Sequence, residues 1–448
     1  MKTKRFFFLI LLFGIILAGC HKEENLSKVD EGVTLKAGTG MLKIAIVSDI
    51  HYMAPELLIQ DGPAFQEYLF QDPKLLAESP VIFQRLIQQL NADKPDLLII
   101  SGDLTKDGEL ISHQQVINLL KTKLDSKIKV LVMPGNHDIA NPDAMYFNGS
   151  VITPAQTITQ ENFKELYEDF GYKDALSMDE HTLSYVAEPF KNFRVIFIDA
   201  TIRPNPEDPN EPPLEGAITQ ETLNWIDAQI ADAHGKHMQI IAVMHHNLIE
   251  HWENQSLIYP GYVINNSAEA AANLYQAGIR VIFTGHDHSN DITKYSGGEL
   301  YDVETGSMVS NPLPYRLIRY YNNDRMEITT KYICGIQLYG FPVEVYARNY
   351  LYEHMVALFD YMLTNPPYSV PEELAAQISP LEASAFVEYY AGDEVMTPDE
   401  ETQLYYYYQL LTTQGYSMAA DVFYATYLAW NTDLPPQDNT LTLNLSEK

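Results

Sequence analysis

Five short blocks of polar residues each follow an apolar run, and their side chains are of the types that metal binding or acid–base catalysis requires. The blocks are Asp49-Ile50-His51, Gly102-Asp103, Gly135-Asn136-His137-Asp138, His245-His246 and Gly285-His286-Asp287-His288. Together they offer carboxylate oxygens, an amide oxygen and imidazole nitrogens, which bind divalent metals and transfer protons. The sequence therefore points first to metal-assisted or acid–base chemistry.

The spacing within the blocks indicates that several of these side chains converge. Residues i and i+2 of an extended chain face the same side, so Asp49 and His51 share a face, as His286 and His288 do. The adjacent pair His245-His246 points to opposite sides if the strand continues, so only one of the two is expected to reach the site. The blocks then supply three oxygen ligands and four imidazoles, too many for one tetrahedral zinc but suited to two ions that share a bridge.

The elements that carry these blocks predict an α/β fold. Apolar, β-branched runs that read as buried strands alternate with segments of helical spacing, which is a βαβαβ rhythm. The expected strands are 43–47, 97–100, 130–133, 239–244 and 281–284, and the expected helices include 82–90, 110–120, 221–233 and 268–276. Because α/β proteins collect ligands at the carboxyl edge of a parallel sheet, we expect the five blocks to meet there.

In their order and in their positions after apolar strands, the five blocks resemble those of the calcineurin-like metallophosphoesterases. Within that superfamily they are most similar to the class III cyclic-nucleotide phosphodiesterases. The resemblance covers residues 41–307 and does not reach the last hundred residues. It implies a two-sheet αββα sandwich with a dinuclear metal centre.

The resemblance also implies a division of labour among the residues. One metal would be held by Asp49, His51, Asp103 and His288. The other would be held by Asp103, Asn136, His245 and His286. Asp103 would bridge the two ions, and His245 would be the ligand of the histidine pair. His137 would protonate the leaving alkoxide or stabilise charge at phosphorus, with Asp138 as a candidate to orient its ring.

We therefore expect a metal-dependent phosphoric ester hydrolase with a small phosphoester substrate, and foremost a phosphodiesterase for cyclic nucleotides or similar diesters. A phosphomonoesterase or nucleotidase with the same metal core, and a non-catalytic surface lipoprotein, are the alternatives. Nitrogen and oxygen donors without a thiolate suit Mn, Fe or Zn, so the identities of the two divalent or trivalent ions stay open.

The amino terminus has the features of bacterial export. Three cations precede the apolar run 6–18, which is too short to span a bilayer, and Leu17-Ala18-Gly19-Cys20 follows it. This stretch resembles the lipobox of bacterial lipoproteins, which implies removal of residues 1–19 and acylation of Cys20. The protein would then be anchored to a bacterial cell membrane, at its outer face or periplasmic side, through a polar tether at residues 20–40.

The charge balance restricts the partners. The formal net charge is −31, and loss of the three cations of the export signal takes it to about −34. Lysine and arginine form no runs, so polymeric nucleic acid is not an expected partner. A small anion can still bind where metal cations reverse the local field.

The carboxyl-terminal region differs in composition from the rest. Fourteen of the 30 tyrosines lie in the last 108 residues, where helical spacing dominates. We expect a catalytic domain at 41–335, an all-α, tyrosine-rich domain at 336–432 and a polar tail at 433–448. Two alternatives stay open for the tyrosines, which either pack among the helices or stack a base, a sugar or a glycan at the site. The insertions 54–80 and 203–213 are either rims of the site or solvated loops.

Overall fold

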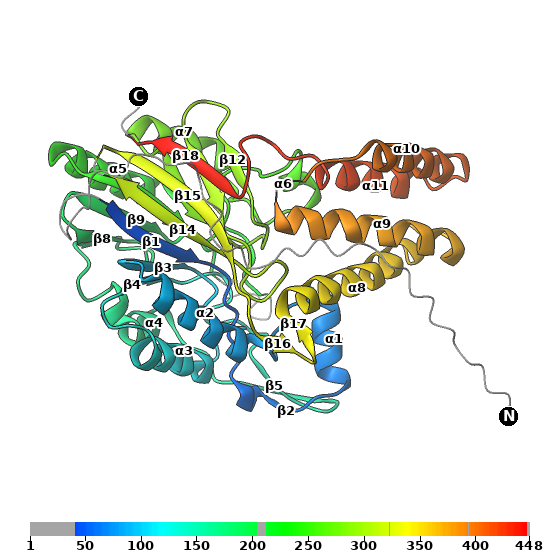
Figure 1. The fold of residues 1–448 in the computed structure, drawn as a ribbon, viewed down its shortest axis with the longest axis horizontal. Coiled ribbons are helices and arrows are strands. Elements are labelled where there is room, and N and C mark those ends of the chain that lie inside the picture. Colours follow the sequence, from blue (N-terminus) through cyan, green and yellow to red (C-terminus); the bar gives the residue numbers. More distant parts are fainter. Residues whose placement is uncertain (1–40, 204–211, 322, 393, 446–448) are drawn as a thin grey trace.

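The computed structural model describes residues 41–203, 212–321, 323–392 and 394–445 (Figure 1). The predicted export signal, Cys20 and the tether lie outside the described residues, as does most of the insertion at 203–213. Within the described residues, no helix combines the length and the apolar character that crossing a bilayer demands.

Two sheets form the centre of the molecule. The first has the order β18-β15-β14-β1-β3-β4, with bounds Thr440–Asn444, Arg325–Tyr332, Pro314–Tyr321, Met41–Val47, Leu97–Ser101 and Lys129–Met133. The second has the order β12-β13-β11-β10-β9-β8-β7, with bounds Ile292–Lys294, Tyr301–Glu304, Val281–Thr284, Gln239–Met244, Phe193–Ile198, Tyr185–Phe190 and Ser177–Met178. Strands β1, β3 and β4 are parallel to one another, and so are β9, β10, β11 and β13.

Helices cover the outer faces of the two sheets. The first sheet carries α2 (Ser79–Asp93) and α3 (Leu110–Lys123), and the second carries α5 (Gln220–Gly235) and α7 (Ser267–Ala277). Strand β10 shows how alternation builds the layers. Ile241 and Val243 belong to the hydrophobic core shared with the first sheet, whereas Ile240, Ala242 and Met244 pack with α5 and α7. The predicted α/β class with two sheets packed between layers of helices is confirmed.

Shorter elements complete this part of the chain. They are 3-10 helices η1 (Pro55–Leu57) and η2 (Glu168–Phe170), helices α1 (Pro63–Gln71), α4 (Gln160–Leu166) and α6 (Gln255–Ile258), and strands β2 (Leu58–Gln60), β5 (Met145–Asn148), β6 (Val151–Pro154), β16 (Gln337–Leu338) and β17 (Phe341–Pro342). Strands β2, β5 and β6 form a small separate sheet. The insertion 54–80 is therefore a structured segment rather than an extended loop.

Four helices project from one side of the sandwich and form what we call the helical lobe (Figure 1). They are α8 (Val343–Thr364), α9 (Glu372–Ala391), α10 (Pro398–Thr413) and α11 (Ser417–Ala429). The lobe has its own hydrophobic core around Trp430, which Trp252 joins from the loop after β10. The chain then returns as β18, which pairs with β15 at the edge of the first sheet. Where the sequence predicts a polar tail after residue 433, the structure thus has a strand, because Leu441 and Leu443 alternate with polar residues.

Candidate metal centre

The polar blocks follow the carboxyl ends of parallel strands in both sheets, and the two sheets bring them together. Asp49 and His51 follow β1, and Asp103 follows β3. The second sheet contributes His245 after β10 and the block around His286 after β11. A direct contact joins the sheets at this point, because the His286 backbone N–H donates to Asp49 Oδ2 at 3.1 Å.

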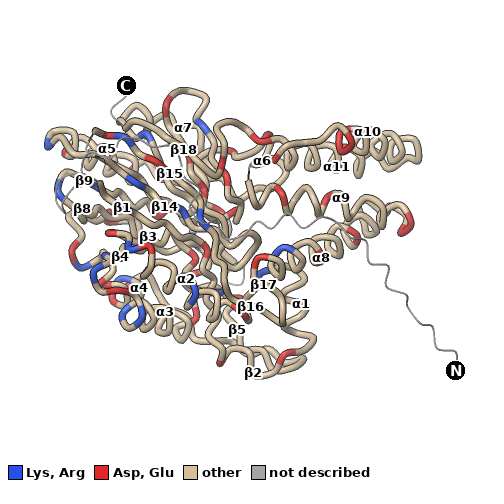
Figure 2. The backbone as a smooth tube through the Cα atoms, in the orientation of Figure 1, with Lys and Arg blue, Asp and Glu red and all other residues tan. Residues whose placement is uncertain are grey.

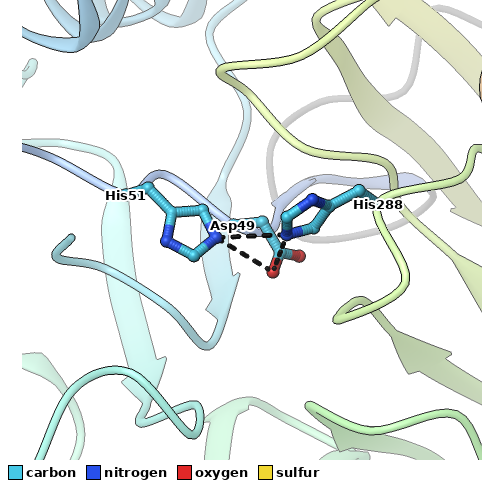
Figure 3. A group of neighbouring side chains, drawn as sticks. All are labelled: Asp49, His51 and His288. Atoms are coloured by element: carbon cyan, nitrogen blue, oxygen red, sulfur yellow. Dashed lines mark hydrogen bonds and ion pairs between the residues drawn. The ribbon is translucent and has the colours of Figure 1, made fainter. Parts of the chain in front are cut away.

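The first cluster of candidate ligands comprises Asp49, His51 and His288 (Figure 3). Asp49 Oδ1 lies 3.7 Å from His51 Nε2 and 3.4 Å from His288 Nε2. The two imidazole nitrogens are 3.1 Å apart. Three potential ligand atoms, from β1 and β11, thus point toward one another in a buried position.

The second cluster comprises Asp103, His245 and His286. His245 Nε2 lies 3.3 Å from Asp103 Oδ2 and 3.0 Å from Asn136 Oδ1, so the Asn136 amide oxygen joins this cluster. Asp103 Oδ2 is also 3.6 Å from His51 Nε2. Asp103 therefore lies between the two clusters, and the structure brings all seven sequence-predicted ligands to one place.

Unpartnered atoms in this cluster are consistent with bound cations. Asp49 Oδ1 and Asp103 Oδ2 are buried and accept no hydrogen bond from the described residues, although buried carboxylate oxygens are normally satisfied. Two donors on one metal, each at about 2.0–2.2 Å, lie roughly 3 Å apart, which is close to the spacings of the two clusters. The mixed set of carboxylate, amide and imidazole donors therefore fits a pair of transition metals.

The electrostatics of the cluster favour anionic carboxylates. Burial raises the pKa of Asp103, but the neighbouring His245 and His137 outweigh burial and hold that pKa well below its usual value. The pKa of Asp49 is also lowered, because the effects of His245 and His288 outweigh that of burial. Burial holds the pKa of His51 well below the usual value. Burial lowers the pKa of His245, but Asp103 and Asp49 outweigh burial and raise that pKa to about 9. The two carboxylates and the His51 ring therefore have lone pairs available to cations, whereas His245 must lose a proton before it binds one.

The backbone around the cluster is strained. Five of the candidate ligands have positive φ angles: Asp49 (51°), His51 (39°), Asp103 (49°), His286 (80°) and His288 (70°). Residues with a Cβ rarely adopt this region, and such strain gathers at functional sites. Two glycines permit the close approach. A Cβ on Gly135 would collide with the Asp103 side chain, and one on Gly285 with Ser48 and Asp49.

His137 lies beside the clusters, and an unexpected carboxylate orients it. Its Nδ1 is 2.8 Å from both Asp107 Oδ1 and the backbone oxygen of Lys106, and its Nε2 is 4.0 Å from Asp103 Oδ2. Burial lowers the pKa of His137, but Asp103 and Asp107 outweigh burial and raise that pKa above its usual value. The imidazole is thus held with Nε2 toward the metal centre.

Asp138 does not orient His137, contrary to the expectation from the sequence. Its carboxylate accepts hydrogen bonds from the backbone N–H groups of Leu104, Thr105 and Gly135 and from the Thr105 hydroxyl. It therefore ties the loop after β3 to the loop after β4. The orienting residue that the sequence reasoning missed is Asp107, and the only signal for it is a second aspartate in the polar run that begins at Asp103.

The structure distinguishes the two adjacent histidines. His245 lies among the carboxylates, and its Nδ1 is 3.0 Å from the backbone oxygen of Ser101. His246 turns away, and its Nε2 is 3.0 Å from the backbone oxygen of Leu214. Burial and the nearby His245 lower the pKa of His246 to about 3, so its ring is neutral at physiological pH.

The helical lobe reaches the centre through Asp287, which stands between His286 and His288 in sequence. The Asp287 carboxylate accepts hydrogen bonds from the Tyr389 hydroxyl of α9 and, at 2.7 Å, from Gln255 Nε2. The N–H of Asn290 also donates to the backbone oxygen of Tyr390 at 3.2 Å. The loop after β11 is therefore fastened to the lobe.

Comparisons with known proteins agree with this geometry. The family model described as calcineurin-like phosphoesterase matches residues 42–290. A probable cyclic nucleotide phosphodiesterase of Fibrobacter succinogenes is 22% identical over 61% of this chain and 82% of its own length. A glycerophosphodiester phosphodiesterase of Enterobacter lignolyticus is 25% identical over 47% of this chain and 63% of its own length.

Among solved structures, a dimetal phosphatase from Danio rerio matches 64% of this chain and 95% of its own chain, with 13% identity and a TM-score of 0.46. The family model covers more than half of the chain and includes every strand end that carries a candidate ligand. Members of this family hydrolyse phosphoesters at a dinuclear metal centre, and the ligand clusters described above are candidates for one. The chain belongs to the calcineurin-like phosphoesterase family.

Proposed function

We propose that this protein is a phosphodiesterase that hydrolyses small phosphodiesters, cyclic nucleotides foremost, at a dinuclear metal centre. The observation that carries the proposal is the position of Asp103, whose Oδ2 lies 3.3 Å from His245 Nε2 and 3.6 Å from His51 Nε2. Two of the relatives are themselves named phosphodiesterases, which favours diesters over monoesters.

Each of the two metals has its own proposed ligands. One site consists of Asp49, His51, Asp103 and His288, and the other of Asp103, Asn136, His245 and His286. Asp103 belongs to both. When bound, such a pair lowers the pKa of water and neutralises charge on the phosphoryl group.

His137 is the proposed proton donor. The carboxylate of Asp107 and the backbone oxygen of Lys106 accept the Nδ1 proton, which leaves Nε2 to face the substrate. Asp103 and Asp107 favour the imidazolium, so its Nε2–H is available. As the phosphorus–oxygen bond breaks, the electron pair goes to the leaving oxygen, and the Nε2 proton neutralises that alkoxide.

We also propose that the protein is exported and held at a bacterial membrane by a lipid on Cys20. The sequence Leu17-Ala18-Gly19-Cys20 after an apolar run supports this proposal. Cys20→Ser is expected to release the protein from the membrane fraction into the soluble fraction, as measured by immunoblotting. Equal membrane association of the variant and the wild type would contradict lipid anchoring.

The function is tested with purified full-length protein in detergent. We expect the metal-loaded protein to bind two transition metals per chain and to hydrolyse bis(4-nitrophenyl) phosphate and a cyclic nucleotide faster than 4-nitrophenyl phosphate. Exclusive hydrolysis of the monoester would indicate a phosphomonoesterase instead. Two bound metals without hydrolysis of any of the three substrates would indicate a non-catalytic protein.

A further inference from the structure

The insertion 54–80 reaches the proposed proton donor through Tyr68 of α1. The Tyr68 hydroxyl donates to Asp107 Oδ2 at 3.0 Å, and Asp107 Oδ1 lies 2.8 Å from His137 Nδ1. Burial and Asp107 raise the pKa of Tyr68 well above its usual value, so the phenol keeps the proton that it donates. Two hydrogen bonds thus connect an insertion without any of the polar blocks to the His137 imidazole.

A buried ammonium contacts the same carboxylate oxygen. Lys106 Nζ donates to Asp107 Oδ2 and, at 3.1 Å, to the backbone oxygen of Asp143. It also lies 4.1 Å from the centroid of the Tyr68 ring and 3.6 Å from Glu109 Oε1. Lys106 is only 1% exposed, and lysines are almost never fully buried unless they are paired. Tyr68 and Lys106 therefore form one buried group of donors around Asp107.

The two oxygens of the Asp107 carboxylate have different partners. Oδ2 accepts from Tyr68 and Lys106, whereas Oδ1 accepts from His137 Nδ1 and, at 3.2 Å, from Asn141 Nδ2. A buried carboxyl group without a nearby cation takes up a proton and is then a poorer acceptor. Here burial raises the pKa of Asp107, but Lys106 and His137 outweigh burial and lower that pKa to about 2.

The orientation of the His137 ring depends on this acceptor. A histidine ring has two nitrogens, and the acceptor at one of them decides what the other faces. With Asp107 Oδ1 and the Lys106 backbone oxygen at Nδ1, Nε2 lies 4.0 Å from Asp103 Oδ2. We propose that Tyr68 and Lys106 are positioning residues for His137, because they hold the Asp107 carboxylate where its Oδ1 accepts the Nδ1 proton. This inference rests on the proposed function, in which His137 is the proton donor.

The first test measures kcat and KM for bis(4-nitrophenyl) phosphate with full-length, Mn²⁺-loaded protein in detergent. Partners that orient a functional side chain contribute about 10–100-fold, so we expect Lys106→Met to lower kcat by about that factor. Tyr68→Phe removes one neutral donor and should lower kcat a few-fold. KM and the two bound metals per chain should stay unchanged, because neither residue is proposed to contact the substrate or a metal.

A double-mutant cycle with Asp107→Asn makes the result specific. This change removes the carboxylate through which both residues are proposed to act. In the Asp107→Asn background, we therefore expect Tyr68→Phe and Lys106→Met to change kcat by less than about 2-fold, which is within the error of such cycles. Effects that multiply with that of Asp107→Asn would show that Tyr68 and Lys106 affect turnover by another route, and they would refute the proposal.

Two matched controls test for general effects. Tyr320→Phe removes a comparable hydrogen bond, from the Tyr320 hydroxyl to Asp324 Oδ1 at 3.2 Å, and Tyr320 pairs with Leu42 at the start of β1. Lys121→Met removes an exposed lysine that pairs with Asp169 at 2.7 Å. Both variants should keep the wild-type kcat. Lys106→Gln replaces Lys106→Met if circular dichroism shows that the latter is unfolded, and Tyr68→Phe tests the proposal in either case.

A spectroscopic measurement distinguishes this inference from the proposed function, because it needs no turnover. In Zn²⁺-loaded protein with ¹⁵N-labelled histidine, the Nδ1 proton of His137 should give a downfield NMR signal that is absent in His137→Ala. We expect Tyr68→Phe and Lys106→Met to shift this signal or broaden it by exchange with water. An unchanged signal in both folded variants would refute the positioning role. Failure of a wild type with two metals to hydrolyse any ester would instead refute the proposed function.

Discussion

The sandwich and the helical lobe both bury carboxyl groups, but the pKa values of these groups shift in opposite directions. Asp49 and Asp103 of the sandwich stand among imidazoles, and their pKa values lie below the usual value although both are buried. In the lobe, the Glu382 carboxyl group accepts a hydrogen bond from the Thr426 hydroxyl, and burial raises its pKa to about 8. Burial alone therefore makes a neutral acid, and the surrounding imidazoles make a carboxylate that is ready for a cation.

The composition of the lobe explains this contrast. Residues 343–432 contain thirteen acidic residues and one basic residue, Arg348 (Figure 2). Arg348 pairs with Glu388 at 2.7 Å on the exposed surface, so it does not neutralise Glu382. The lobe contacts the sandwich through hydroxyl groups instead, with Tyr389 on Asp287 of the loop after β11 and Tyr350 on the backbone of Lys74. The comparison predicts that ligand changes abolish activity, whereas lobe changes only modulate it.

The largest effect is expected for Asp103→Asn, which removes the charge that both metals share. We expect fewer than two metals per chain by elemental analysis and a loss of at least about 10⁴ in kcat/KM, because each metal contributes several kcal/mol. Asp169→Asn, at an exposed carboxylate, is the control and should be fully active. An Asp103→Asn variant that keeps both metals and its activity would refute the proposal that Asp103 bridges the two metals.

His137→Ala should separate chemistry from metal binding. We expect both metals to stay bound while kcat falls about 10²–10⁴-fold, the usual contribution of a general acid. Asp107→Asn, which weakens the orientation of the same ring, should cost about 10–100-fold. Normal turnover by His137→Ala would exclude His137 as the proton donor.

Tyr389→Phe tests whether the lobe modulates the centre. The change leaves Asp287 with one hydrogen-bond donor fewer in a buried position, which should cost about 1–3 kcal/mol of folding free energy. Because Asp287 lies between two proposed ligands, we also expect metal affinity to drop a few-fold in titrations with Mn²⁺. Tyr406→Phe, at a tyrosine that is 57% exposed, is the matched control. Equal metal affinity in Tyr389→Phe and the wild type would show that the lobe does not modulate the metal centre through Tyr389.

Glu382→Gln should leave turnover unchanged and alter only the pH dependence of stability. The folded protein holds a proton on Glu382 up to about pH 8, whereas the unfolded chain releases it near pH 4.3. This group therefore stabilises the fold fully below about pH 4.3 and progressively less as the pH rises toward 8. Urea unfolding between pH 5 and pH 9 should show a flatter profile in the variant. Identical profiles would mean that Glu382 is not a buried neutral acid.

The sequence predicted those features that depend on residues close together along the chain. The spacing of Asp49 and His51 after one strand is enough to place both side chains at its end. The choice between Asp107 and Asp138 as the partner of His137 is different, because it depends on how the loop after β3 folds against the loop after β4. No local spacing encodes that contact.

Two further features required the tertiary structure. The insertion 54–80 carries no motif, and only the tertiary structure shows that it packs against the lobe, where the Tyr350 hydroxyl donates to the Lys74 backbone oxygen. Strand β18 has an alternating pattern over Thr440–Asn444, but its partner β15 precedes it by more than a hundred residues. A five-residue alternation cannot by itself specify such a remote partner.

Strand β18 also determines how the lobe can be manipulated. The chain leaves the first sheet after β15, passes through four helices and returns as β18 beside that same strand. The lobe is therefore an insertion between two neighbouring strands of the sheet and not a carboxyl-terminal extension. Contacts just before the strand also hold the returning chain, since Asp438 Oδ1 accepts from the Ile292 backbone N–H at 2.9 Å and Arg316 donates to the Asp438 backbone oxygen. A stop codon before α8 would therefore strip an edge strand from the sandwich, whereas excision of the helices with religation to residue 438 would spare it.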